Sequence, residues 1–297
     1  MEAQELLPVN IAEPRLSLSN ILMATDLSEA SDRALEYALA VARRYDSHLY
    51  LAHVLTPDGY QYAPTVYPIV RQSAEEGIAN ILVSGRLRGI PHEVLIEEGY
   101  LWPTLERLIR KLQIDLAVVG THGRTGVDRL ILGSSAELIF RHADCPVLTV
   151  GPAAQGEVPR EAKPQNILLP TNFGRAAEHA LPYALSLAQE FAAKLTLLHV
   201  IEDSAGYSES GLATLQDTTL LRLEQYLPPG ALRHCTPECT VGFGDPANEI
   251  LELARERKAD LIVMGAKRGS RLTGHLPLST AYTVAASAAS PVMTVKG

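Results

Sequence analysis

Most of this sequence consists of two similar copies, and this internal repeat constrains the fold more than any other feature. Ser28–Val54 aligns without a gap on Gly174–Val200, and the match resumes further along after the loss of one residue from the second copy. Self-similarity over so long a span indicates two copies of one domain, each about 140 residues long. Identical pairs include Ala30/Ala176, Ala34/Ala180, Leu35/Leu181, Tyr37/Tyr183, Ala38/Ala184, His53/His199, Val54/Val200, Asp115/Asp260, Gly120/Gly265 and Pro146/Pro291.

The segment between the copies is rich in proline and charge, which is typical of a linker. We predict an N-terminal extension at residues 1–18, a first domain at 19–151, a linker at 152–164 and a second domain at 165–297. The chain is 46% hydrophobic, so each copy has enough apolar residues to bury a core of its own.

Apolar runs alternate with helical patterns along the first copy. Ser28 is placed to cap the first helix. Strands that alternate with helices predict an α/β fold, in which a parallel sheet is covered on both faces. Ligands of such sheets bind at the carboxyl ends of the strands. The expected strands are 20–24, 48–54, 93–96, 116–119 and 147–150, and the expected helices are 30–44, 70–87, 104–112 and one more after residue 133.

A glycine-rich segment follows the fourth expected strand. Gly120-Thr121-His122-Gly123 leads through a short loop to Gly133-Ser134-Ser135, which opens the next helix. Glycines let backbone N–H groups approach an oxyanion, and a helix start adds unpaired amides and a positive dipole end. Two such elements can close round a polyphosphate; the alternative is a pair of glycine-rich turns with an ordinary serine cap. Because Thr25-Asp26 and Val54 also end expected strands, the candidate residues converge on one crevice, which favours a binding site.

Composition argues against several classes of partner. The net charge of −8 and the pI near 5.6 argue against nucleic acid, since no basic stripe could neutralise its phosphates. No apolar run approaches the roughly 18 residues of a membrane helix, and residues 1–14 lack the basic start of a secretion signal. Cys145, Cys235 and Cys239 lack zinc-finger spacing, so reduced thiols explain them better than half a metal site. We expect a cytoplasmic protein without a metal site.

Three motifs resemble those of the universal stress protein family. The resemblance covers nearly the whole chain beyond the N-terminal extension. It implies two pseudo-two-fold-related copies of a five-stranded parallel α/β sandwich, of the adenine nucleotide alpha hydrolase-like type. It also implies ATP at the glycine loop and pairing of the copies through their last strands. The motifs are Gly-x2-Gly-x9-Gly-(Ser/Thr) of the family's nucleotide-binding members at Gly120, Gly123, Gly133 and Ser134, Thr-Asp-x-Ser at Thr25–Ser28, and His-Val at His53-Val54.

The resemblance also implies roles for individual residues. Asp26 would accept hydrogen bonds from ribose or adenine, although capping a helix is an alternative and compatible role. Val54 would offer backbone groups to adenine. His53 is better explained as a hydrogen-bonded sheet histidine, because its counterpart His199 persists in the second copy.

The phosphates would lie against the glycine segment. Gly120 and Gly123 would let the loop approach them, and Gly133, Ser134 and Ser135 would hold the β and γ groups. His122 and Arg124 would add contacts, with a solvated loop charge as the equal alternative for Arg124. The full set of expected nucleotide-binding residues is Thr25, Asp26, Val54, Gly120, His122, Gly123, Arg124, Gly133, Ser134 and Ser135.

The second copy departs from the nucleotide-binding pattern. Asp26 becomes Asn172, Gly123 becomes Arg268 and Gly133 becomes Leu278, although Ser279 and Thr280 keep their hydroxyls. The new side chains at 268 and 278 would obstruct a backbone cradle. We therefore expect ATP in the first copy alone and a largely structural second copy.

The sequence shows no hydrolytic machinery. It lacks a Gly-x4-Gly-Lys-(Ser/Thr) loop, an acidic pair for Mg²⁺ beside the glycines and a Ser/His/Asp arrangement, so we assign no catalytic residue. We expect a stress-response module that binds ATP, with or without Mg²⁺, and lacks fast catalysis. The alternatives are a slow ATPase or adenylyl-transfer enzyme and a nucleotide-free scaffold. The two copies would pair within the chain, and a homodimer of whole chains stays open.

Overall fold

The computed structural model describes residues 16–57, 64–121, 132–151, 153–154, 158, 160–202, 206–228, 236–267 and 279–297. Of the expected site residues, His122, Gly123 and Arg124 lie outside these ranges. In the second copy, Arg268 and Leu278 lie outside them as well.

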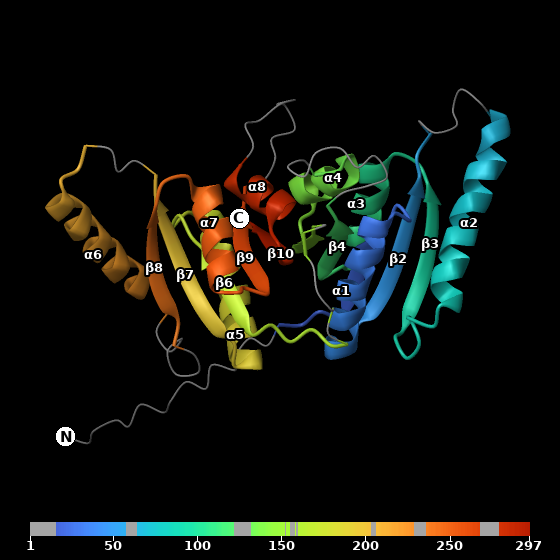
Figure 1. Cartoon of the computed structure of the whole chain (residues 1–297). Coiled ribbons are helices and arrows are strands. Elements are labelled where there is room, and N and C mark those ends of the chain that lie inside the picture. The colour runs from blue at the N-terminus through green and yellow to red at the C-terminus, as the bar shows by residue number, and fades with distance from the viewer. Residues whose placement is uncertain are drawn as a thin grey trace, which may run out of the picture.

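The strands form one ten-stranded sheet that runs through both copies (Figure 1). Its order is β3-β2-β1-β4-β5-β10-β9-β6-β7-β8, so the strand order of the second copy is that of the first in reverse. Neighbours within each copy are parallel, whereas β5 and β10 are antiparallel. The predicted α/β fold of two pseudo-two-fold-related copies is confirmed. The strands are β1 (Asn20–Ala24), β2 (His48–Leu55), β3 (His92–Glu98), β4 (Leu116–Gly120), β5 (Val147–Val150), β6 (Asn166–Pro170), β7 (Lys194–Ile201), β8 (Glu238–Phe243), β9 (Leu261–Ala266) and β10 (Val292–Lys296).

Helices cover both faces of this sheet. One buried core includes residues of α1, α2, α5 and α6, and the other includes residues of α3, α4, α7 and α8. Side chains alternate between the faces of a strand, so Ile21 and Met23 enter the first core while Leu22 enters the second. The helices are α1 (Glu29–Tyr45), the 3-10 turn η2 (Pro64–Val66), α2 (Tyr67–Val83), α3 (Leu101–Lys111), α4 (Ser134–His142), α5 (Arg175–Phe191), α6 (Glu209–Tyr226), α7 (Pro246–Glu256) and α8 (Thr280–Ser287).

Helix α1 forms where its alanine pattern predicts. Ala34, Ala38 and Ala42 are buried, and their small side chains let the helix lie close to the sheet. Ser28 caps the helix as expected, because its side chain accepts a hydrogen bond from the Ser31 N–H. Asp46 ends it in the left-handed conformation, with φ of 53°.

Helix α2 differs from the expected helix at residues 70–87. It begins earlier, with Pro68 in its first turn, where a missing N–H is tolerated. It ends at Val83, because Gly85 and Gly89 adopt φ of 75° and 80° and turn the chain toward β3. Left-handed backbone of this kind cannot continue a right-handed helix.

The two copies meet at the antiparallel pair of β5 and β10. Val292 lies opposite Thr149, and Thr294 lies opposite Val147. The Thr149 hydroxyl donates to the Val292 carbonyl at 3.2 Å, and the Thr294 hydroxyl donates to the Val147 carbonyl at 3.4 Å. One contact is therefore made twice across the pseudo-two-fold axis, and each copy covers the sheet edge that the other would expose.

Candidate functional site

Several of the expected binding residues lie at one edge of the first copy's sheet, the edge formed by the carboxyl ends of its parallel strands. Thr25 and Asp26 follow β1, Val54 lies near the end of β2, and Gly120 ends β4. Strand β1 lies between β2 and β4, so these ends are neighbours. The Thr25 N–H donates to the Ala52 carbonyl at 2.9 Å, which ties the end of β1 to β2. This edge is where parallel α/β sheets bind their ligands.

Asp26 is a half-buried carboxylate held by the start of α1. Its Oδ1 accepts from the Ser28 N–H at 3.0 Å and from the Ser31 hydroxyl. Burial by itself raises the pKa of Asp26, but the hydrogen bonds from Ser28 and Ser31 outweigh it and hold the pKa below its usual value. Asp26 is therefore ionised at neutral pH. Since Ser28 is the helix cap, Asp26 does not fill the alternative role of capping residue.

Ser31 was missed by the sequence reasoning. Its side chain is buried, and its hydroxyl donates to Asp26 while also accepting from the Asp26 N–H at 3.2 Å. A signal was present in the repeat, because the equivalent residue of the second copy is Ala177. A buried hydroxyl that is present in one copy and replaced by a methyl group in the other distinguishes the local hydrogen bonding of the two copies.

His53 makes the same contact as its counterpart in the second copy. A ring nitrogen of His53 lies 2.8 Å from the Thr25 carbonyl, and His199 lies 2.8 Å from the Thr171 carbonyl. Both contacts join the end of a first strand to the adjacent second strand. A role within the sheet explains this histidine without nucleotide chemistry.

Gly120 is needed by packing in both copies. A Cβ at Gly120 would lie 2.6 Å from the Ala30 carbonyl oxygen, and one at Gly265 would lie 2.4 Å from the Ala176 carbonyl oxygen. The backbone at the start of α1 or α5 approaches too closely for any other residue. This explains why Gly265 persists in a copy that has lost two other glycines of the motif. Close approach to phosphate stays a prediction for Gly120.

The start of α4 lies beside the end of β4. Gly133 is the residue that caps α4, and its N–H donates to the carbonyl of buried Thr121 at 2.6 Å. No described side chain caps the first turn, and Ser134 is exposed while Ser135 is half-buried. The N–H groups of a first turn have no partners within their own helix.

The matching helix of the second copy is arranged differently. Ser279 aligns with Ser134, but it stands one place earlier relative to its helix, as the cap of α8. Its hydroxyl accepts from the Tyr282 N–H at 3.2 Å, so the second copy caps its own helix start. Among the described residues, the first copy shows no such cap at the start of α4, which lies at the same end of the sheet as ionised Asp26.

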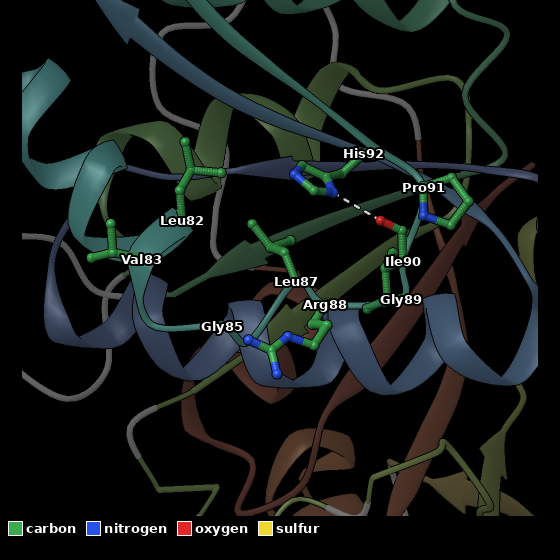
Figure 2. A pocket seen from close by; sticks show the side chains of 9 residues that line it. All are labelled: Leu82, Val83, Gly85, Leu87, Arg88, Gly89, Ile90, Pro91 and His92. Atoms are coloured by element: carbon green, nitrogen blue, oxygen red, sulfur yellow. Dashed lines mark hydrogen bonds between the residues drawn. The ribbon is translucent and has the colours of Figure 1, made fainter.

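A surface pocket lies away from this edge (Figure 2). Leu87, Ile90 and His92 are among its lining residues, and His92 begins β3, so the pocket lies at the amino-terminal end of the strand. No expected site residue lines it. Within the described ranges, no group of three metal-ligating side chains gathers, and no helix is long and apolar enough to cross a membrane.

The fold defines the chain as a tandem α/β protein whose candidate residues lie at the carboxyl ends of parallel strands, where proteins of this class bind their ligands. The sequence model of the universal stress protein family matches residues 18–151 and 164–296. Because these two matches take in most of the chain, the protein belongs to the universal stress protein family.

Some relatives align over nearly the whole chain and others over about half of it. A universal stress protein of Mycolicibacterium smegmatis is 28% identical over 296 residues, covering 93% of this chain and 96% of the relative. One from Methanocaldococcus jannaschii is 27% identical over 136 residues, covering 44% of this chain and 80% of the relative. The crystal structure of a universal stress protein from Archaeoglobus fulgidus aligns with a TM-score of 0.68 and 21% identity, covering 93% of this chain and 98% of that one. A Pseudomonas aeruginosa protein of unknown function aligns at 0.63 and 17% identity, covering 95% and 93%. These structures share its fold.

Proposed function

We propose that this universal stress protein binds ATP in its first copy alone and serves as a nucleotide-dependent regulatory module of the stress response. The observation that carries the proposal is the difference between the two helix starts. That of α4 has no described side-chain cap, whereas that of α8 is capped by Ser279. A free helix start favours an anion, because its N–H groups and dipole face the same way.

The described residues suit the parts of the nucleotide. Asp26, ionised and half-buried, would accept hydrogen bonds from the ribose or the adenine edge. Val54 would offer its backbone to adenine. The Gly133 amide is engaged by Thr121, so the amides and hydroxyls of Ser134 and Ser135 would hold the β and γ groups.

The remaining motif residues belong to the proposal on sequence grounds. His122, Gly123 and Arg124 would complete the contacts to the phosphates, with or without Mg²⁺. We assign no residue to hydrolysis, because the sequence offers no Gly-x4-Gly-Lys loop to bind the phosphates of a fast ATPase. A regulatory role needs only that bound ATP change the surface or pairing of the protein.

The thiols fit a cytoplasmic setting. Cys145 and Cys239 are free, and burial raises the pKa of the Cys145 thiol to about 12. A protonated thiol is a poor nucleophile and resists oxidation. Unpaired thiols are typical of a reducing compartment, so we propose a cytoplasmic location on this basis and on the composition.

Native purification followed by mass spectrometry of the released ligand tests the proposal directly. We expect ATP at no more than one equivalent per chain. A single-turnover assay then separates the regulatory module from the slow ATPase or adenylyl-transfer alternative: ATP retained over hours supports the module. Protein that carries no nucleotide and binds none in calorimetry would leave the scaffold alternative and overturn the proposal.

A further inference from the structure

A tyrosine of the second copy reaches the candidate site of the first. Tyr282 belongs to α8 and is 4% exposed. Its hydroxyl accepts a hydrogen bond from the Leu132 N–H at 3.2 Å. Leu132 comes directly before Gly133, so the contact is made at the entrance to α4.

The Tyr282 hydroxyl stays protonated at neutral pH. Burial, followed by the charge of Glu137, raises the pKa of Tyr282. Glu137 is itself paired with Arg141 of α4 at 2.8 Å. A protonated hydroxyl still has lone pairs with which to accept the Leu132 N–H.

Two adjacent amides at the entrance to α4 are bound by residues of different copies. The Leu132 N–H is held by Tyr282 of the second copy, and the Gly133 N–H is held by Thr121 of the first. The Tyr282 ring also packs edge-on against Phe140 of α4, with centroids 6.0 Å apart and planes at 88°. Tyr282 of the second copy therefore contacts both the entrance to α4 and a residue within it.

The sequence permits this contact only from the second copy to the first. Glu137 occupies the position in the first copy that Tyr282 occupies in the second, and Leu132 is matched by Pro277. Proline has no N–H, so the first copy cannot hold the second in the same way. The sequence of each copy is specialised at both positions of this contact.

We propose that Tyr282 is a positioning residue for the phosphate side of the candidate site, through which the second copy sets the nucleotide affinity of the first. The inference rests on the proposed ATP binding and deepens it. With the Tyr282 hydroxyl in place, the first-turn amides of α4 are oriented before the ligand arrives, and binding pays no cost to order them. Without the hydroxyl, the buried Leu132 amide loses its acceptor and the helix start shifts to find another.

The test compares Tyr282→Phe with Tyr45→Phe in the full chain, by calorimetry with ATP and with adenosine. Tyr45→Phe is a matched control, because the Tyr45 hydroxyl also crosses between the copies, to Glu190 at 3.0 Å, but from the last turn of α1. For Tyr282→Phe we expect ATP affinity to fall about tenfold, the size expected when a buried donor loses its acceptor. Adenosine affinity should stay within about twofold, because adenosine has no phosphate to contact α4. Tyr45→Phe should bind both ligands like the wild type.

Each other outcome has a definite meaning. Wild-type ATP affinity in Tyr282→Phe would overturn the inference alone. Equal losses for ATP and adenosine, or the same loss in Tyr45→Phe, would indicate general loosening of the interface and overturn it too. If the wild-type chain binds no ATP at all, the proposed function itself fails. Circular dichroism and the melting temperature of both variants show whether each is folded when it is titrated.

Discussion

Arg44 and Glu190 occupy equivalent positions in the two copies and form an ion pair with each other across the interface. Glu190 also accepts a hydrogen bond from Tyr45, and the Arg44 guanidinium lies 5.0 Å from the centre of the Phe191 ring. If two identical copies paired in this way, arginine would face arginine or glutamate would face glutamate. The pair therefore favours association of the first copy with the second over association of either with its own kind.

A charge swap tests this specificity. Arg44→Glu places two carboxylates together and should lower the melting temperature of the full chain, and adding Glu190→Arg should restore most of the loss. Contacting residues of this kind show coupling energies of about 0.5–3 kcal/mol, and we expect the lower half of that range because both side chains are partly exposed. Chemical denaturation of the wild type, both single variants and the double variant gives the coupling. Additive effects would show that the pair does not set the preference.

The glycine that caps α4 gives a direct test of the candidate site. Gly133→Leu installs in the first copy the residue that the second has at position 278. The side chain should block approach of the phosphates, so ATP affinity should fall at least about tenfold, or about 1.4 kcal/mol. The fold should change little, since the sequence of the second copy carries leucine at the aligned position. Wild-type affinity in this variant would show that ATP, if it binds, does so elsewhere.

Stoichiometry tests the assignment of the two copies. We expect calorimetry to report one ATP per chain, because the second copy has lost Asp26, Gly123 and Gly133 and caps its own helix through Ser279. The variant Ser279→Ala should leave this number unchanged, because residues 268 and 278 still carry side chains. Two equivalent sites per chain would contradict the assignment.

Asp26→Asn should separate charge from local structure. In the second copy, Asn172 Oδ1 accepts from the Gly174 N–H at 3.0 Å, the same turn that Asp26 makes with Ser28. The variant should therefore fold normally yet bind ATP more weakly, because an amide is a poorer acceptor than a carboxylate. Calorimetry on the purified variant measures the loss, and an unchanged affinity would remove Asp26 from the site.

The same residue predicts a pH dependence of stability. The folded pKa of Asp26 is lowered, so its contribution is fully present above the unfolded value of about 3.9 and is lost as the pH falls through the folded pKa. Across that acid range, the free energy of unfolding should depend less steeply on pH in Asp26→Asn than in the wild type. Parallel curves would mean that the hydrogen bonds from Ser28 and Ser31 add no such stability.

The repeat and the alternation of elements were enough to predict the fold, and strands β1 and β5 have the predicted bounds. The end of α2 was placed too late, because apolar periodicity continues past Val83 while the backbone turns at Gly85. A hydrophobic pattern does not report the sign of φ.

The positions of the candidate residues were predictable where they lie at the end of a strand or helix, and less so elsewhere. Gly120 was interpreted as an approach for phosphate, whereas its contact with the Ala30 backbone gives a packing reason that spacing cannot reveal. Tyr282 could not be found from local pattern at all, since its contact with Leu132 exists only after the two copies pair. Contacts across a pseudo-two-fold axis depend on which strands meet, and no single motif records that.

The pairing of β5 with β10 is the last feature to test. Thr149 lies between Val119 of β4 and Val292 of β10, so proline at this position would remove a ladder donor inside the sheet rather than at an edge. Thr149→Pro should destabilise the full chain by at least about 1–3 kcal/mol, the cost of leaving a buried acceptor without its donor. Thr149→Val and Thr294→Val are matched controls, because each removes one of the two equivalent hydroxyl contacts and leaves the backbone intact. Each of these variants should lower the free energy of unfolding by about 1 kcal/mol, and the two losses should be similar because the contacts are related by the pseudo-two-fold axis.

Separately produced halves, residues 1–155 and 160–297, should associate at micromolar concentration in the wild type and much more weakly with Thr149→Pro. Failure of the wild-type halves to associate would show that the linker, rather than the strand pair, holds the copies together.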